Sequence, residues 1–127
     1  MKLHSDPTSA LNTITGYGDG YIEVNRTPHA HAVVFSPDGD VMRWSPTSVE
    51  EIDAAALAQA VDLTTKPLPE VLLIGTGVRQ RFLAAALLRP LLKAGVGVEM
   101  MDSQAAARTY NILMAEDRRV VVALLLA

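Results

Sequence analysis

The residues best placed for chemistry form a glycine-rich turn after an apolar run, Gly75-Thr76-Gly77-Val78-Arg79-Gln80. A turn that joins a strand to a helix offers free backbone N–H groups at the positive end of the helix dipole, so it can hold an anion. A dinucleotide fingerprint needs a third glycine where Gln80 stands, and a phosphate loop needs a lysine beside Ser or Thr. The turn therefore predicts a tight structural connection or a small-anion site, and no cofactor.

Two arginines favour the anion interpretation. A helix is predicted over residues 80–93, so Arg79 and Arg81 fall at its first turn. The helix dipole disfavours cations there by a few tenths of a kcal/mol each. Either their guanidinium groups turn into solvent, or a negative group binds beside them.

A second polar turn follows the next apolar strand, where Asp102 precedes a helix predicted over residues 103–115. As an N-cap, its carboxylate accepts the free N–H groups of the first helical turn, and Ser103 could do the same. The two turns follow strands that we predict to be adjacent and parallel, and open α/β sheets bind ligands at that edge. The side chains expected to converge there are Arg79, Asp102, Arg108, Tyr110 and Asn111.

Each of these side chains also has a structural interpretation. Asp102 could serve only as a helix cap. Arg108 could form a salt bridge or lie on an exposed helix face, and Tyr110 could pack in the core with its hydroxyl at the rim. The crevice is therefore a hypothesis.

Other reaction chemistry finds little support in the residues. The chain has no cysteine, which removes disulfides and thiolate catalysis. His29 and His31, with His4, are too few to complete a structural zinc site, so we predict no metal. No Gly-x-Ser-x-Gly nucleophile motif is present, and the carboxylates are scattered. The sequence does not indicate a reaction.

Length and composition favour one globular domain over residues 1–127, with 1–12 as a loosely ordered N-terminal segment. Half of the residues are hydrophobic and the formal net charge is −3. Without a concentrated basic patch, nucleic acid and anionic membranes are poor partners. No apolar run is long enough to span a bilayer, so we expect no membrane insertion and a cytoplasmic location.

The two halves of the chain differ in pattern. Residues 14–44 predict short antiparallel strands, including a pair around Gly16–Gly20 and a hairpin formed by 33–35 and 41–44. A helix capped by Thr47 or Ser48 follows. The second half then alternates strands over 71–74, 96–101 and 120–126 with the two helices already named, which requires parallel neighbours. The predicted fold is an α/β domain in three layers, with a mostly parallel central sheet, helices and an antiparallel N-terminal β segment.

The sequence resembles a domain-of-unknown-function family that includes the mitochondrial complex I assembly factor three and the adipogenesis-associated human protein. The resemblance covers nearly the whole chain from Asn12 onward. The blocks that carry it are Ile14–Gly18, Ser36–Gly39, Leu73–Gly77, Gly95–Asp102, Arg108–Asn111 and Glu116–Val120.

The resemblance implies the same three-layer β/α fold and a bacterial protein of unassigned activity. It implies no established catalytic residues. It also implies that the mitochondrial relative acts by binding other proteins, and we expect no mitochondrial presequence in this chain. The candidate-site positions that match the family are Gly75, Gly77, Asp102, Arg108, Thr109, Tyr110 and Asn111.

Two functions follow from these observations. The first is a non-enzymatic binding module with a protein partner or a second copy, which could pair along an edge strand formed by residues 120–126. The second is a small-anion site, open to catalysis, at residues 75–81 beside Asp102, with Thr76 in the turn.

Overall fold

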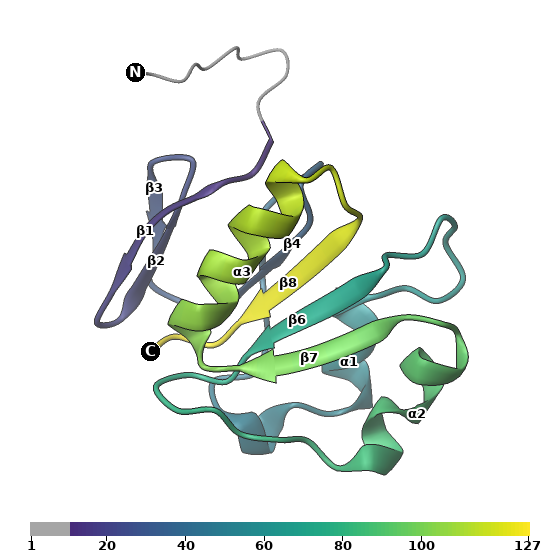
Figure 1. The fold of residues 1–127 in the computed structure, drawn as a ribbon. Helices are drawn as coiled ribbons and strands as arrows, with labels where there is room; N and C mark the ends of the chain where they lie inside the picture. The colour runs from purple at the N-terminus through teal and green to yellow at the C-terminus, as the bar shows by residue number, and fades with distance from the viewer. Residues whose placement is uncertain (1–10) are drawn as a thin grey trace.

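The computed structural model describes residues 11–127, which form a mixed α/β fold with two β-sheets and three α-helices (Figure 1). The smaller sheet has the order β1-β2-β3, with β1 at Ile14–Gly18, β2 at Tyr21–Val24 and β3 at Thr27–His29. The larger sheet has the order β5-β4-β8-β6-β7, with β4 at Val33–Phe35, β5 at Met42–Arg43, β6 at Val71–Gly75, β7 at Gly97–Met101 and β8 at Val120–Leu124. The helices are the 3-10 turn η2 at Val49–Glu51, α1 at Ala54–Ala60, α2 at Ala85–Lys93 and α3 at Ser103–Ala115.

The larger sheet is mixed rather than mostly parallel. Strand β6 runs parallel to both β7 and β8, as the alternating pattern predicts. Strand β4, however, pairs antiparallel with β8 on one side and with β5 on the other. The predicted β4–β5 hairpin thus extends the central sheet, while β1, β2 and β3 form the separate antiparallel sheet.

The last strand does not lie at an edge, which corrects the expectation for residues 120–126. Strand β8 lies between β4 and β6, and the edges of the larger sheet are β5 and β7. An apolar strand covered on both faces suits a central position. Because β8 already has a neighbour on each side, a partner strand cannot pair with it.

Alternate residues of β6 supply two separate cores. Leu72 and Ile74 belong to a cluster that includes buried residues of α1 and α2. Val71 and Leu73 belong to a second cluster, which includes buried residues of α3 and of the smaller sheet. Figure 1 shows α3 in front of the larger sheet and α1 behind it. Because side chains alternate along a strand, both faces of the sheet are covered.

Two helices begin later than the sequence predicts. Ser48 and Thr47 do not cap an α-helix: Ser48 precedes only η2, and the side chain of Asp53 caps α1 by accepting the Ala56 N–H at 2.9 Å. Helix α2 begins at Ala85 rather than Gln80, because the residues before it form a loop fixed by side chains. It ends at Lys93, as predicted, and Pro90, which was expected to kink the helix or end it early, lies inside it.

The N-terminal part holds a strand and a contact that the sequence does not indicate. Strand β3 contains Pro28, a residue that argues against a strand except at a sheet edge, where β3 lies. Of the predicted N-terminal segment, residues 1–10 lie outside the described residues. Asn12 is buried, and its side chain donates to the carbonyls of Ser36 and Gly39 at 2.9 and 3.0 Å.

Replacing Asp53 by Ala tests the start of α1. The substitution removes the acceptor for the Ala56 N–H, so we expect the free energy of unfolding to fall by about 1 kcal/mol in a urea titration. Ser48→Ala, the matched control, should change it by less than about 0.5 kcal/mol. Equal losses in the two variants would contradict the assignment of Asp53 as the cap.

Candidate functional site

The glycine-rich turn and the Asp102 turn lie side by side at the carboxyl edge of the larger sheet, as predicted from their positions. Gly75 is level with Met101 on β7 and with Leu124 on β8. The Thr76 N–H donates to the Met101 carbonyl at 2.8 Å, and the Ser103 N–H donates to the Gly77 carbonyl at 2.9 Å. Backbone hydrogen bonds therefore join the two turns directly.

Gly75 permits this close approach between β6 and the start of α3. A Cβ added to Gly75 would lie 2.6 Å from Leu124 Cδ2 and 2.9 Å from the Ser103 Cα. Neither the strand nor the helix can occupy its present place if residue 75 carries a side chain. Gly77 has a φ of +94°, which other residues adopt with strain.

The N–H groups expected to hold an anion are in part used within the chain. The buried Ser103 hydroxyl accepts the Gly77 N–H at 2.8 Å and donates to the Leu125 carbonyl at 2.6 Å. Asp102 accepts the Ala105 N–H at 2.9 Å and so acts as the cap of α3. The glycine-rich turn is thus built against a capped helix.

The chain that follows is fixed by one hydroxyl and one amide. Thr76 Oγ1 lies 2.6 Å from the Arg79 carbonyl and accepts the Arg81 N–H at 3.1 Å. The Gln80 side-chain amide donates to the Met100 carbonyl at 3.0 Å. These contacts hold residues 76–81 as a loop, so Arg79 and Arg81 do not lie in the first turn of a helix, and the dipole argument for an anion there no longer applies.

The loop presents apolar and basic side chains to solvent. Val78 is 78% exposed and Phe82 is 72% exposed. Arg81 pairs with Glu50 at 2.6 Å, and this hydrogen bond and positive charge lower the pKa of the Glu50 carboxyl. Arg79 is exposed between the two apolar residues. Such a loop suits contact with another molecule better than proton transfer.

The remaining candidate residues lie further along α3 and contact β1 and Asn12. Arg108 Nη1 donates to the Tyr17 hydroxyl at 3.1 Å. The buried Tyr110 hydroxyl donates to the Asn12 carbonyl at 2.6 Å. The side-chain amide of Asn111 bonds both the N–H and the carbonyl of Ile14, at 2.9 and 2.8 Å.

The candidate residues therefore form two groups. Thr109 Oγ1 lies 3.5 Å from Met101 Sδ and so adjoins the turns at the carboxyl edge. Asn111 lies nine residues after Asp102, about 13 Å along the helix axis. Asn111 and Tyr110 instead hold β1 and Asn12 against α3. Sequence reasoning missed Asn12, whose position no local pattern indicates.

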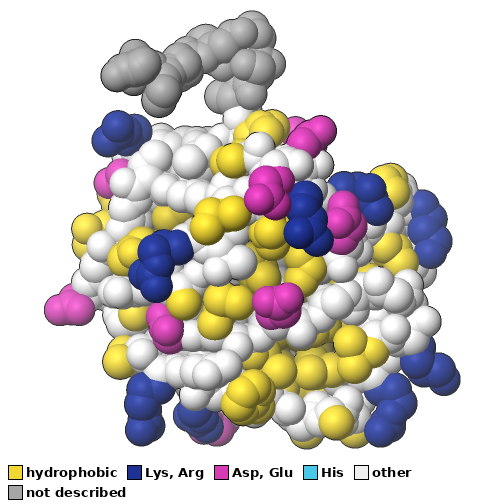
Figure 2. Space-filling model, in the orientation of Figure 1, with side chains coloured by type: hydrophobic (Ala, Val, Ile, Leu, Met, Phe, Trp, Pro, Cys, Tyr) yellow, Lys and Arg dark blue, Asp and Glu magenta, His cyan; other side chains and the backbone are white. Residues whose placement is uncertain are grey.

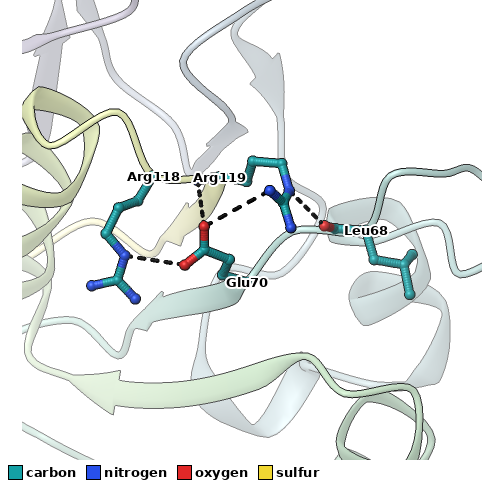
Figure 3. Close-up of polar contacts among 4 residues, drawn as sticks. All are labelled: Leu68, Glu70, Arg118 and Arg119. Carbon is teal, nitrogen blue, oxygen red and sulfur yellow. Dashed lines mark hydrogen bonds and ion pairs between the residues drawn. The ribbon is translucent and has the colours of Figure 1, made fainter.

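A further polar cluster lies at the other end of β6 (Figure 3). Glu70 accepts Arg118 Nε at 3.2 Å, and Arg119 Nε donates to the Leu68 carbonyl at 3.1 Å. The bond from Arg118 lowers the pKa of Glu70, with a smaller effect from the Arg119 backbone N–H. The two arginines also line a cavity of about 500 Å³ next to Met114. Glu70 is held ionised as an acceptor, which fits a structural link between β6 and β8.

Among residues 11–127, His29 and His31 do not gather with other metal ligands. The rings of His29 and His31 lie 5.6 Å apart, and burial, with a smaller effect from His31, lowers the pKa of His29. Residues 11–127 contain no group of three or more His, Cys, Asp and Glu side chains that could hold a metal ion. His4 lies outside the described residues.

Comparison with known proteins places the chain among relatives of several kinds. A family model described as "Protein of unknown function (DUF498/DUF598)" matches residues 14–125. A Francisella tularensis protein named "13 kDa major membrane protein" is 40% identical over 120 residues, covering 94% of this chain and 95% of the relative. A Danio rerio protein named NADH dehydrogenase [ubiquinone] 1 alpha subcomplex assembly factor 3 is 35% identical over 126 residues, covering 98% of this chain and 70% of the relative.

A solved structure supports the same fold. The crystal structure of a Bordetella parapertussis protein is 59% identical and aligns with a TM-score of 0.85, covering 94% of this chain and 98% of that protein. Within residues 11–127, the structure contains no helix with the length and apolar character needed to cross a bilayer. Because the Francisella relative is named a membrane protein, the expected cytoplasmic location stays a prediction.

Replacing Gly75 by Ala tests the close approach of β6 and α3. The added methyl group meets the backbone of Ser103 and the side chain of Leu124, so we expect the free energy of unfolding to fall by about 3 kcal/mol. The control is Gly16→Ala, where the new Cβ would lie no nearer than 3.4 Å to another atom. A Gly75→Ala protein as stable as the control would show that the two elements separate easily.

The Tyr110 hydroxyl predicts a dependence of stability on alkaline pH. Burial, with a smaller effect from Asp38, raises the pKa of Tyr110 well above its usual range. The unfolded chain therefore loses this proton first, so the contribution to stability is complete below about pH 10 and falls as the pH rises further. Tyr110→Phe should lower the free energy of unfolding by about 1 kcal/mol at pH 7 and weaken its decline above about pH 10.

Urea titrations at pH 7 and at a pH above about 10 measure this effect. Tyr21→Phe is the control, because Tyr21 lies at the surface. An unchanged alkaline decline in Tyr110→Phe would contradict the assignment.

Proposed function

The chain belongs to the family of proteins of unknown function described as DUF498/DUF598, and on that premise we propose that it is a non-enzymatic binding or assembly module that acts through protein–protein contacts. The name of the Danio rerio relative supports this proposal, since it describes a factor in the assembly of a multi-subunit complex. By this analogy, subunits of NADH dehydrogenase are the first partners to test.

The observation that carries the proposal is the loop at residues 76–82. Its backbone is fixed by Thr76 and Gln80, and it nevertheless leaves Val78 and Phe82 largely exposed. A fixed loop loses little conformational entropy on binding, so more of the contact energy contributes to affinity. Aromatic side chains that enter a pocket of the partner often dominate the binding energy of an interface.

The sheet edges offer a weaker route to a partner. Strand β5 has two residues, and the outward carbonyl of Met100 on β7 already accepts the Gln80 amide. A partner strand would have to displace that bond. The loop is therefore the better contact surface.

Replacing Phe82 by Ser tests the proposal. Affinity-tagged full-length protein is expressed in its own cells, and the recovered NADH dehydrogenase subunits are quantified by mass spectrometry. We expect Phe82→Ser to reduce their recovery at least about tenfold, because the loss of a buried Phe removes about 2 kcal/mol or more of binding energy. The control is Ile112→Ser, at a residue 59% exposed on α3, and its recovery should match the wild type.

A thermal-shift series with phosphates and carboxylates tests the small-anion alternative. We expect no rise in melting temperature for the wild type or for Arg79→Ala. A rise in the wild type that disappears in Arg79→Ala would assign the loop to anion binding. Equal recovery of the subunits by the wild type and Phe82→Ser would count against the loop as a protein contact.

A further inference from the structure

Positive charge is concentrated around the loop and α2. Residues 71–98 contain Arg79, Arg81, Arg89 and Lys93 and no acidic side chain. Of the 11 basic side chains four lie here, which leaves seven against all 14 acidic ones in the rest of the chain. One segment is thus basic within an acidic protein.

The exposed side chains of this segment lie toward one side of the molecule. On α2, Leu88 and Leu91 are buried, whereas Arg89, Leu92 and Lys93 are exposed at spacings that share one helix face. Figure 1 places α2 and the loop before it along the lower edge of the view, and Figure 2 shows Lys and Arg side chains at the two lower corners, with hydrophobic side chains and white surface between them. We name this the basic–apolar face, and it comprises Val78, Arg79, Phe82, Arg89, Leu92 and Lys93.

We propose that the basic–apolar face docks on an acidic protein surface with an apolar socket for Phe82 and Val78, an inference that rests on the proposed function. Arg81 is already paired with Glu50, so the charges left for a partner are Arg79, Arg89 and Lys93. Carboxylates at the rim of the socket complement these cations. Such rim charges mainly raise the rate of association and make it sensitive to salt.

The packing of α2 favours a protein over a membrane as the occupant. A helix that lies in a bilayer surface needs a free apolar face. In α2 that face is used by Leu88 and Leu91, which belong to the core. The large apolar side chains that this face exposes, Val78, Phe82 and Leu92, suit pockets of a folded partner better than a continuous lipid phase.

Site-directed photocrosslinking in cells tests this docking surface in the full chain. Photoreactive benzoylphenylalanine replaces Val78 or Leu92 in the basic–apolar face, or Ile112 as an exposed control outside it. We expect Val78 and Leu92 to form adducts with the same protein, and Ile112 to form none. The double change Arg89→Glu and Lys93→Glu should reduce the adducts roughly tenfold.

A matched double change, Arg26→Glu and Arg43→Glu, alters the net charge equally at exposed positions elsewhere and should leave the adducts unchanged. Adducts at Ile112 alone, or adducts insensitive to Arg89→Glu and Lys93→Glu, would overturn this docking surface and leave the proposed protein-contact function standing. No adduct at any position would overturn both.

Co-sedimentation with vesicles of phosphatidylcholine and phosphatidylserine tests the membrane alternative. We expect the purified wild type to stay in the supernatant. Sedimentation that is lost in the Arg89→Glu and Lys93→Glu variant would assign the face to an anionic membrane and overturn the protein docking site.

Discussion

The close contact between the end of β6 and the start of α3 determines the arrangement of the carboxyl edge of the larger sheet. Gly75 allows the approach, and the Ser103 hydroxyl links the Gly77 N–H to the Leu125 carbonyl at the end of β8. One small residue and one buried hydroxyl therefore join two parallel strands to a helix. The loop held by Thr76 and Gln80 begins directly at this junction.

This junction also explains why the glycine-rich turn differs from the anion site that its sequence suggests. Its sequence is typical of a turn that binds an anion at a helix N-terminus. In the structure, the Ser103 hydroxyl accepts the Gly77 N–H and the Thr76 hydroxyl accepts the Arg81 N–H. Helix α2 begins only at Ala85. The side chains that remain available are apolar and basic, and they face outward. This arrangement fits the proposed contact with another protein.

The elements that the sequence predicts well are those whose evidence is local. The apolar run of β6 and the Asp-capped helix α3 depend on neighbours in the chain, and both occur where they are expected. The start of α2 depends on the Thr76 hydroxyl, which in turn bonds the Met101 carbonyl. Neither residue lies within 80–93, so the helical pattern of that range could not indicate these contacts. The position of β8 depends on β4, a strand far from it in the sequence.

The candidate site shows the same difference between residues with local evidence and residues with distant partners. The two turns could be placed together because parallel strands end at one edge of a sheet. Tyr110 and Asn111 could not be assigned, because their partners Asn12 and Ile14 lie about a hundred residues earlier in the chain. Tyr110 packs in the core, which was the structural alternative predicted for it, and its hydroxyl donates to the Asn12 backbone carbonyl.

The Gln80 amide has a second consequence at the open edge of the sheet. An unpaired edge strand can add strands from other molecules and so begin aggregation. On β7, the outward Met100 carbonyl is occupied by Gln80, and the exposed Glu99 places a carboxylate in the middle of the strand. The loop that we propose as the partner contact therefore also protects the edge strand β7 from pairing with a strand of another molecule.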